Sequence, residues 1–143
     1  MTRTTLALLV TTLLTACSAD ESNQPEPPAH AGGHAHGPHG GHVLEVGDHV
    51  AHLEVLHDEK AGKLTLYVLG SDAKTPLPVA KPPQLKLTTA AGPKVLDTQA
   101  SDESGSVFKV TDAALKGHEP EGRIAIEVNG KTYNPDLEHD HGH

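Results

Sequence analysis

From Val43 onward the chain alternates large apolar and polar residues in short runs, and this pattern limits its fold more than any other feature. The clearest runs are residues 43–46, 49–56 and 63–69. A period of two residues, rich in Val, Leu and Thr, predicts β-strands that bury one face. Shorter runs of the same kind predict strands at residues 84–88, 94–97, 107–110 and 123–128. We therefore expect an all-β fold.

Turn signals separate these predicted strands. The Asn129-Gly130 dipeptide is the one most typical of a two-residue hairpin, and Gly62 is available for a positive φ in an earlier loop. One helical turn is expected at residues 112–115, capped by Thr111 or Asp112. Short strands spaced about ten residues apart predict a small antiparallel β-sandwich of immunoglobulin-like architecture.

Composition limits the interior of this domain, which we assign to residues 43–137. The only aromatic residues are Tyr67, Phe108 and Tyr133, so Val, Leu, Ile and Ala must build the core. Prolines at positions 76, 78, 82 and 83 belong to an edge strand or a long connection, because a proline nitrogen cannot donate to a ladder. The Cys…Trp…Cys pattern of true immunoglobulin domains is absent, so the prediction concerns architecture alone.

Residues 1–16 have the features of an export signal peptide. Arg3 supplies a positive charge, residues 6–14 are apolar apart from threonines, and small residues precede Cys17. The apolar run is too short to cross a bilayer as a helix, which takes about 20 residues. The LTAC sequence at residues 14–17 resembles the lipobox of bacterial lipoproteins, in which the cysteine is diacylated and the chain is cut before it.

Cys17 is the only cysteine, so it has no disulfide partner, and a lipid gives it a function. Two or more acyl chains anchor a protein stably to a membrane. The residue after Cys17 is Ser18, at the position where Asp would be an inner-membrane signal. By resemblance to Gram-negative sorting rules, this implies the outer membrane, facing the periplasm. An ordinary signal peptide with an incidental cysteine is the alternative.

Residues 17–42 are predicted to be a disordered N-terminal segment. Residues 18–29 are polar, acidic and proline-rich, and residues 30–42 contain only histidine, glycine, alanine and one proline. Neither composition can bury enough apolar surface to offset chain entropy. We expect this segment to contribute nothing to the core. Residues 138–143 form a second histidine-rich tail.

Histidine is far more abundant than a small domain requires, with 12 residues among 143. Low-complexity histidine tracts are typical of metal binding. In a glycine-containing chain, the four histidines within residues 34–42 could wrap one ion. The predicted metal ligands are His30, His34, His36, His39 and His42 in the N-terminal tract, His52 and His57 on the second strand, and His139, His141 and His143 at the C-terminus.

Other interpretations stay open for each group of histidines. The N-terminal tract can be a solvated linker, and His52 and His57 can be satisfied polar residues of a partly exposed sheet. By parity, His52 shares one face of its strand with Glu54, whereas His49 and His57 lie on the other. The C-terminal cluster can form a second site, or join the N-terminal ligands if both ends emerge on one side. His118 stands alone in a loop.

Ligand softness narrows the choice of metal. Sulfur occurs only in Met1, lost on processing, and in the lipidated Cys17, so no soft ligand remains for Cu(I). Imidazole suits Zn(II), Cu(II) and Ni(II), and acid should release them because protons compete for the ring. The PHGG sequence at residues 38–41 resembles the copper-binding core of prion octarepeats, in which an imidazole and deprotonated glycine amides share one Cu(II).

Charge and motifs exclude other classes of function. Without residues 1–16 the chain keeps ten Lys and Arg, one fewer than the 11 of the full sequence, against 19 Asp and Glu. This acidic balance disfavours nucleic acid as a partner. No GxSxG, HExxH or P-loop pattern occurs, so we do not expect an enzyme.

Residues 38–42, 57–63 and 65–69 resemble small His-rich bacterial envelope lipoproteins of uncharacterised function, and the His-rich segment of some periplasmic metal-efflux adaptor subunits. The resemblance implies a periplasmic metal-handling module whose partner is an efflux or uptake component. The sequence thus predicts a lipid-anchored envelope protein that binds, buffers or hands on a divalent transition metal. The alternative is a non-metal interaction or assembly lipoprotein with a pH-sensitive histidine surface.

Overall fold

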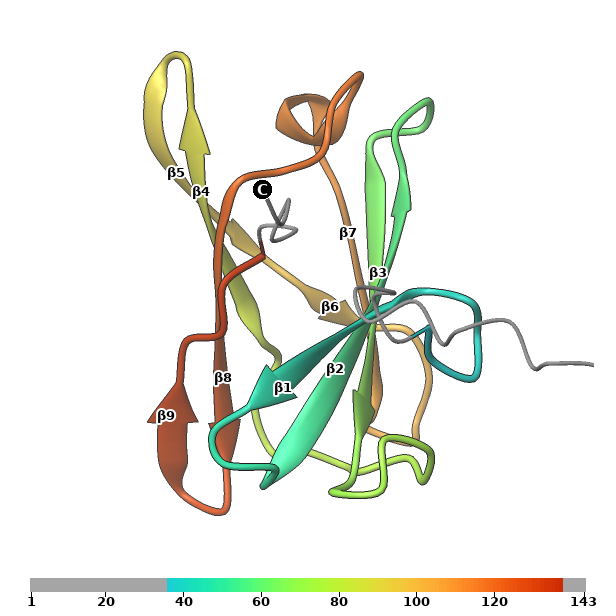
Figure 1. Ribbon diagram of the computed structural model, residues 1–143. Helices are drawn as coiled ribbons and strands as arrows, with labels where there is room; N and C mark the ends of the chain where they lie inside the picture. Colours follow the sequence, from blue (N-terminus) through green and yellow to red (C-terminus); the bar gives the residue numbers. More distant parts are fainter. Residues whose placement is uncertain (1–35, 138–143) are drawn as a thin grey trace, which may run out of the picture. The chain divides into compact units, whose positions relative to one another are not determined.

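Figure 1 shows the computed structural model of the protein, which describes residues 36–137. These residues form nine strands and one 3-10 helix. The elements are β1 (His42–Val46), β2 (Ala51–Asp58), β3 (Lys63–Leu69), β4 (Gln84–Thr89), β5 (Gly92–Asp97), β6 (Gln99–Ala100), β7 (Val107–Thr111), η1 (Ala113–Leu115), β8 (Gly122–Val128) and β9 (Lys131–Tyr133). Within this part of the chain, no helix is long and apolar enough to span a membrane.

The strands make two antiparallel sheets that pack against each other around one core. The first sheet has the order β1-β2-β3-β7-β6, and the second has the order β5-β4-β8-β9. Buried side chains of both sheets meet between them, among them Leu53, Leu66 and Phe108 from the first sheet and Leu85 and Ile124 from the second. The predicted small antiparallel β-sandwich is confirmed.

Several local predictions are also confirmed. Asn129 and Gly130 have φ values of 51° and 76° and connect β8 to β9, and Gly62 has a φ of 63° between β2 and β3. Asp112 caps η1 by accepting a hydrogen bond from the N–H of Ala114 at 2.8 Å.

Two strand assignments differ from the prediction. His49 does not belong to β2 but lies in the preceding turn with a positive φ of 52°, so strand parity does not apply to it. β6 is not among the predicted strands, because its two residues, Gln99 and Ala100, are too few to show an alternation.

The last part of the histidine tract has a defined structure. Residues 36–42, which we call the His loop, form a tight hairpin in which the N–H of Gly37 donates to the carbonyl of Gly41 at 2.9 Å and His36 pairs with His42. His42 is already the first residue of β1. The first strand thus begins one residue before Val43, where the domain is predicted to start. Hydrogen bonds, and not apolar side chains, order this loop.

β1 is shorter than β2, and this difference leaves part of β2 uncovered. The pairing of β1 with β2 ends at His42 and Val55, whereas β2 continues to pair with β3 as far as Asp58. Within residues 36–137, residues 56–58 therefore have a partner strand on one side only. A pocket lies beside this end of β2.

Candidate metal site

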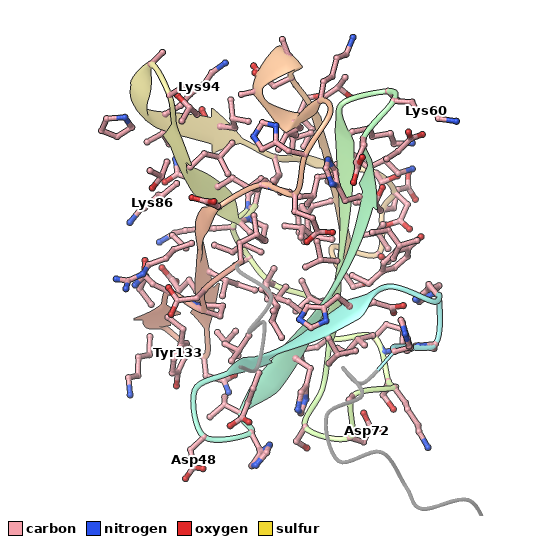
Figure 2. All side chains as sticks on the ribbon, turned by 45° about the horizontal axis from the view of Figure 1, so that its top comes forward. Asp48, Lys60, Asp72, Lys86, Lys94 and Tyr133 are labelled. Atoms are coloured by element: carbon pink, nitrogen blue, oxygen red, sulfur yellow. The ribbon has the colours of Figure 1, made fainter. Side chains whose placement is uncertain are left out.

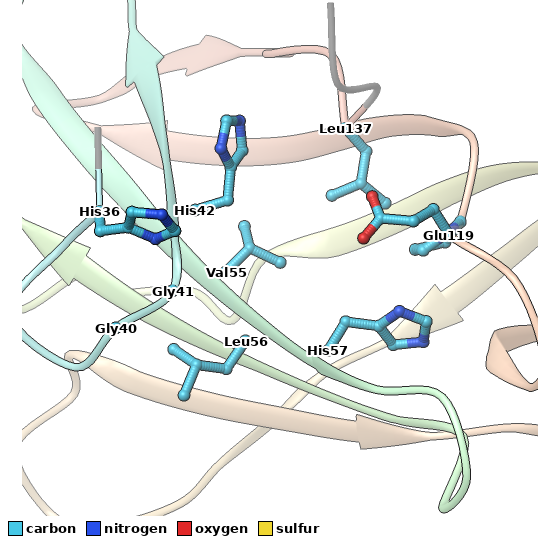
Figure 3. Close-up of a pocket in the computed structure, with 10 residues that line it drawn as sticks. His36, Gly40, Gly41, His42, Val55, Leu56, His57, Glu119 and Leu137 are labelled. Atoms are coloured by element: carbon cyan, nitrogen blue, oxygen red, sulfur yellow. The ribbon is translucent and has the colours of Figure 1, made fainter. Parts of the chain in front are cut away.

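The pocket beside β2 has a volume of about 620 Å³ (Figure 3). Three predicted metal ligands line it: His36 and His42 from the His loop, and His57 from β2. Glu119 reaches it from the segment between η1 and β8. The other lining residues are mainly apolar and comprise Gly40, Gly41, Val55, Leu56, Pro120 and Leu137. The pocket thus combines an apolar wall with imidazole and carboxylate groups.

Within residues 36–137, one ring nitrogen of His57 has a hydrogen-bond partner and the other has none. Its Nε2 donates a hydrogen bond to the carbonyl oxygen of Leu115 at 2.6 Å. The lone pair of the neutral ring therefore belongs to Nδ1, which is buried with no hydrogen-bond partner among the described residues. Buried polar atoms in folded proteins almost always have a partner, so an orphaned one is a natural position for an ion or a water molecule.

Two glutamates lie close to His57. A ring nitrogen of His57 and a carboxylate oxygen from each of Glu59 and Glu119 all lie within 4.8 Å of one another. Glu59 belongs to the β2–β3 loop, where its carbonyl accepts a hydrogen bond from the N–H of Gly117 at 3.3 Å. Both glutamates are exposed, so an ion can reach them from solvent. One imidazole and two carboxylates are ligands that Zn²⁺ accepts in proteins.

A second polar arrangement centres on Glu54, whose side chain is fully buried. Its Oε1 accepts hydrogen bonds from the N–H groups of His39 at 2.7 Å and of Gly41 at 2.8 Å. Its Oε2 lies 2.7 Å from Nδ1 of His39. The His39 ring stacks on Tyr67, with centroids 3.8 Å apart and planes inclined by 9°. The expectation that residues 30–42 contribute nothing to the core is wrong for the His loop, because it supplies the donors that a buried carboxylate requires.

Glycines make this docking possible. A Cβ on Gly41 would lie 2.5 Å from Cδ1 of Leu56 and 2.6 Å from the carbonyl oxygen of Val55, and a Cβ on Gly37 would collide with the carboxyl group of Glu54. Gly37 and Gly41 therefore serve close packing, a role beyond the chain flexibility and copper coordination that the sequence suggests for the glycines of this tract.

The predicted ligands do not converge on a single point. His36, His42 and His57 share the pocket, whereas His39 does not line it and engages Glu54 instead. His52 is 9% exposed, and its Nδ1 donates to the carbonyl of Gly70 at 3.0 Å. This bond fits the interpretation of His52 as a satisfied polar residue of the sheet.

Another acidic group lies at the β1–β2 turn. A ring nitrogen of His49 and carboxylate oxygens of Glu45 and Asp48 lie within 4.8 Å of one another. Figure 2 shows that Asp48 and Lys60 lie at opposite ends of the molecule, so this group is remote from the β2–β3 loop. All three residues are exposed, and Glu45 accepts a hydrogen bond from the N–H of His49 at 3.1 Å. We assign no metal to this group.

The two glutamates beside His57 are not among the metal ligands predicted from the sequence. Glu59 stands two positions after His57, and Glu119 directly follows His118, so two local His–Glu pairs are visible in the sequence. Their convergence depends on the segment after η1 lying beside the end of β2. Local spacing carries no information about that approach.

Several predictions fall on residues 1–35 and 138–143, which lie outside the described residues. These are the signal peptide, the spacer, the lipid site at Cys17, and the ligands His30, His34, His139, His141 and His143. No protein family, curated protein or solved structure matches the chain.

Proposed function

We propose that this protein is a lipid-anchored envelope protein that binds a divalent transition metal in the pocket beside β2, and buffers it or hands it on. The observation that carries the proposal is the His57 ring, whose buried Nδ1 has no hydrogen-bond partner among the described residues and which lies close to Glu59 and Glu119. A metal ion at Nδ1 satisfies this lone pair and leaves the bond from Nε2 to Leu115 intact.

Electrostatics favour a cation between these groups. The carboxylate oxygens of Glu59 and Glu119 lie within 4.8 Å, a separation at which two negative charges repel. A divalent ion replaces this repulsion with attraction. The bond from His57 to a backbone carbonyl also fixes the ring and its tautomer, as the second nitrogen of a metal-bound histidine commonly does.

The donor atoms indicate the class of metal. Imidazole nitrogen together with carboxylate oxygen suits Zn(II), Cu(II) or Ni(II), whereas Cu(I) prefers sulfur. His36 and His42 line the same pocket but lie outside the group formed by His57, Glu59 and Glu119, so we assign only these three residues to the ion.

Both ends of the described chain reach the pocket. His36 is its first residue and Leu137 its last, and both line the pocket wall. His30 and His34 precede this part of the chain, and His139, His141 and His143 follow it. In this proposal the two histidine-rich segments exchange metal with the pocket and with an efflux or uptake component. Cys17 carries the lipid, and the protein works at the outer membrane, facing the periplasm.

A second candidate is a non-metal interaction lipoprotein. The apolar wall formed by Val55, Leu56, Pro120 and Leu137, together with the uncovered edge at residues 56–58, favours it. Such an edge can pair with an extended peptide by adding one strand to the sheet.

Calorimetric titration of the chelator-stripped mature protein with Zn²⁺, Cu²⁺ and Ni²⁺ at neutral pH separates the two candidates. We expect a tight site that is lost in His57→Ala and in the double variant Glu59→Gln, Glu119→Gln. His118→Ala is the matched control, because His118 is exposed and does not line the pocket. Binding no tighter than about millimolar for every ion leaves only the second candidate. Loss of incorporated palmitate in Cys17→Ala tests the anchor.

A further inference from the structure

The contacts of Glu54 decide which atoms of the His loop are available to a ligand. A carboxylate only accepts hydrogen bonds, so Nδ1 of His39, 2.7 Å from Oε2, carries a proton. In the neutral ring the lone pair then belongs to Nε2. The two nitrogens lie on different edges of the imidazole, so Nε2 points away from the buried carboxylate.

The ring of His39 is also held in orientation. It lies flat on Tyr67 at 3.8 Å, and the N–H of the same residue donates to Oε1 of Glu54 at 2.7 Å. The side chain nevertheless remains 41% exposed. The ring of His39 is therefore held in one orientation while part of the side chain stays open to solvent.

This geometry conflicts with copper chelation by the loop backbone. Nδ1 is the ring nitrogen nearer the main chain, so it is the one that can close small chelate rings with deprotonated amides. In the His loop, Nδ1 of His39 and the N–H of Gly41 both contact Glu54. Chelation through them removes donors from a carboxylate that is 0% exposed. Leaving a buried acceptor unsatisfied is unfavourable.

We propose that Glu54 is a specificity-determining residue that directs a divalent metal ion to Nε2 of His39 and prevents chelation by the loop amides. The proposal rests on the proposed metal-binding function and adds a ligand outside the pocket. Metal-bound histidines commonly donate their other N–H to a carboxylate, which orients the ring and raises its basicity. His39 and Glu54 have this arrangement before any metal arrives. The other coordination positions stay open to water or to ligands of a partner, which suits transfer of the ion.

The first test needs no variant. Long-range ¹H–¹⁵N correlation spectra of the metal-free mature protein report the tautomer of each histidine. We expect the proton of His39 on Nδ1, and we expect Zn²⁺ to shift the Nε2 resonance while Nδ1 stays protonated. A proton on Nε2, or metal bound at Nδ1, overturns the proposal.

The second test compares Cu²⁺ electron paramagnetic resonance spectra of the wild type, Glu54→Gln and Glu45→Gln at neutral pH. Glu45 is the matched control, because it lies on the neighbouring strand but is exposed. The wild type and the control should show imidazole coordination without amide nitrogen, and Glu54→Gln should gain amide nitrogen. The affinity of the Glu54→Gln variant for Zn²⁺ at His39 should fall about 10- to 100-fold relative to the wild type. Equal amide coordination in the wild type and Glu54→Gln overturns the proposal.

The same spectra distinguish this proposal from the proposed function. If Zn²⁺ shifts the resonances of His57 but not those of His39, the role of Glu54 is wrong and the pocket site stands. If Zn²⁺ shifts neither residue, both proposals fail.

Discussion

His57 on β2 and Leu115 in η1 are joined by a hydrogen bond of 2.6 Å although 58 residues separate them in the chain. The bond ties the end of the first sheet to a short helix that Asp112 caps. It also determines the tautomer of His57, because a carbonyl oxygen can only accept. One backbone carbonyl thus decides which nitrogen of the neutral ring keeps its lone pair.

Replacing His57 with Ala should remove the response of thermal stability to metal. A ligand at 100 times its Kd stabilises the folded state by about 2.7 kcal/mol, so zinc should raise the Tm of the wild type. Without metal the Tm should change little, because loss of the bond to Leu115 is offset by removal of a buried nitrogen that has no hydrogen-bond partner within residues 36–137. Thermal denaturation with and without zinc measures both effects. A full zinc response in His57→Ala, equal to that of His118→Ala, contradicts the site.

Replacing His39 with Ala should destabilise the metal-free protein by about 1–3 kcal/mol, because a buried carboxylate loses a hydrogen-bond donor. The composition of the tract alone predicts no such effect from one of its histidines. Urea denaturation in the presence of chelator measures the change. His36→Ala is the control, because His36 is exposed. The hydrogen bonds to Glu54 within residues 36–137 come from His39 and Gly41. Equal stability of the two variants argues against docking of the His loop.

A methyl group at position 41 should detach the His loop. The Cβ of Gly41→Ala would lie 2.5 Å from the Leu56 side chain and 2.6 Å from the backbone of β2, which cannot move aside cheaply. At Gly40 a Cβ meets nothing within 4 Å, but φ is 82°, so Gly40→Asn is the suitable control. Amide hydrogen exchange should show faster exchange at His39 and residue 41 in Gly41→Ala alone. Unchanged protection in that variant contradicts the packing.

Asp72 should make stability depend on pH in the acid range. Hydrogen bonds from the Thr75 hydroxyl, and then from the N–H groups of Thr75 and Lys74, lower the pKa of Asp72 from 3.8 to about 2. A folded pKa below the unfolded value stabilises the protein above pH 3.8, and this contribution disappears as the pH falls toward 2. Asp72→Asn should therefore be less stable than the wild type at neutral pH and equally stable near pH 2.

Urea denaturation at several pH values measures this difference. Asp48→Asn provides a comparison in another exposed turn. If the stability difference between Asp72→Asn and the wild type stays constant across the acid range, the expected dependence of stability on the ionisation of Asp72 is excluded.

The sheet strands could be predicted because a strand that buries one face alternates apolar and polar residues, and this alternation is visible within a few positions of the sequence. Residues 63–69 alternate and form β3 with the predicted bounds, and the Asn129-Gly130 turn follows from its own backbone preference. The His loop could not be predicted in this way. It has no large apolar side chain to bury, and its docking onto β2 uses a carboxylate 15 residues after His39.

The candidate site was predictable only in part. Abundance and spacing identify the histidines as potential ligands, and parity places His52 and Glu54 on one face of β2 and His57 on the other. Parity does not reveal that the His loop covers Glu54 from outside. Nor does it reveal the approach of Glu119, because that depends on how the chain crosses from the first sheet to the second.

The docking of the His loop also provides a criterion for sorting histidine-rich sequences. A signature of this docking can be read from sequence alone. It consists of Gly37, His39 and Gly41, with an acidic residue 15 positions after the histidine. In the proposed role of Glu54, a tract with the same histidines but a neutral residue at that later position keeps its amides available to copper. The number of histidines is then a poor guide to metal preference, and a residue that contains no imidazole is a better one.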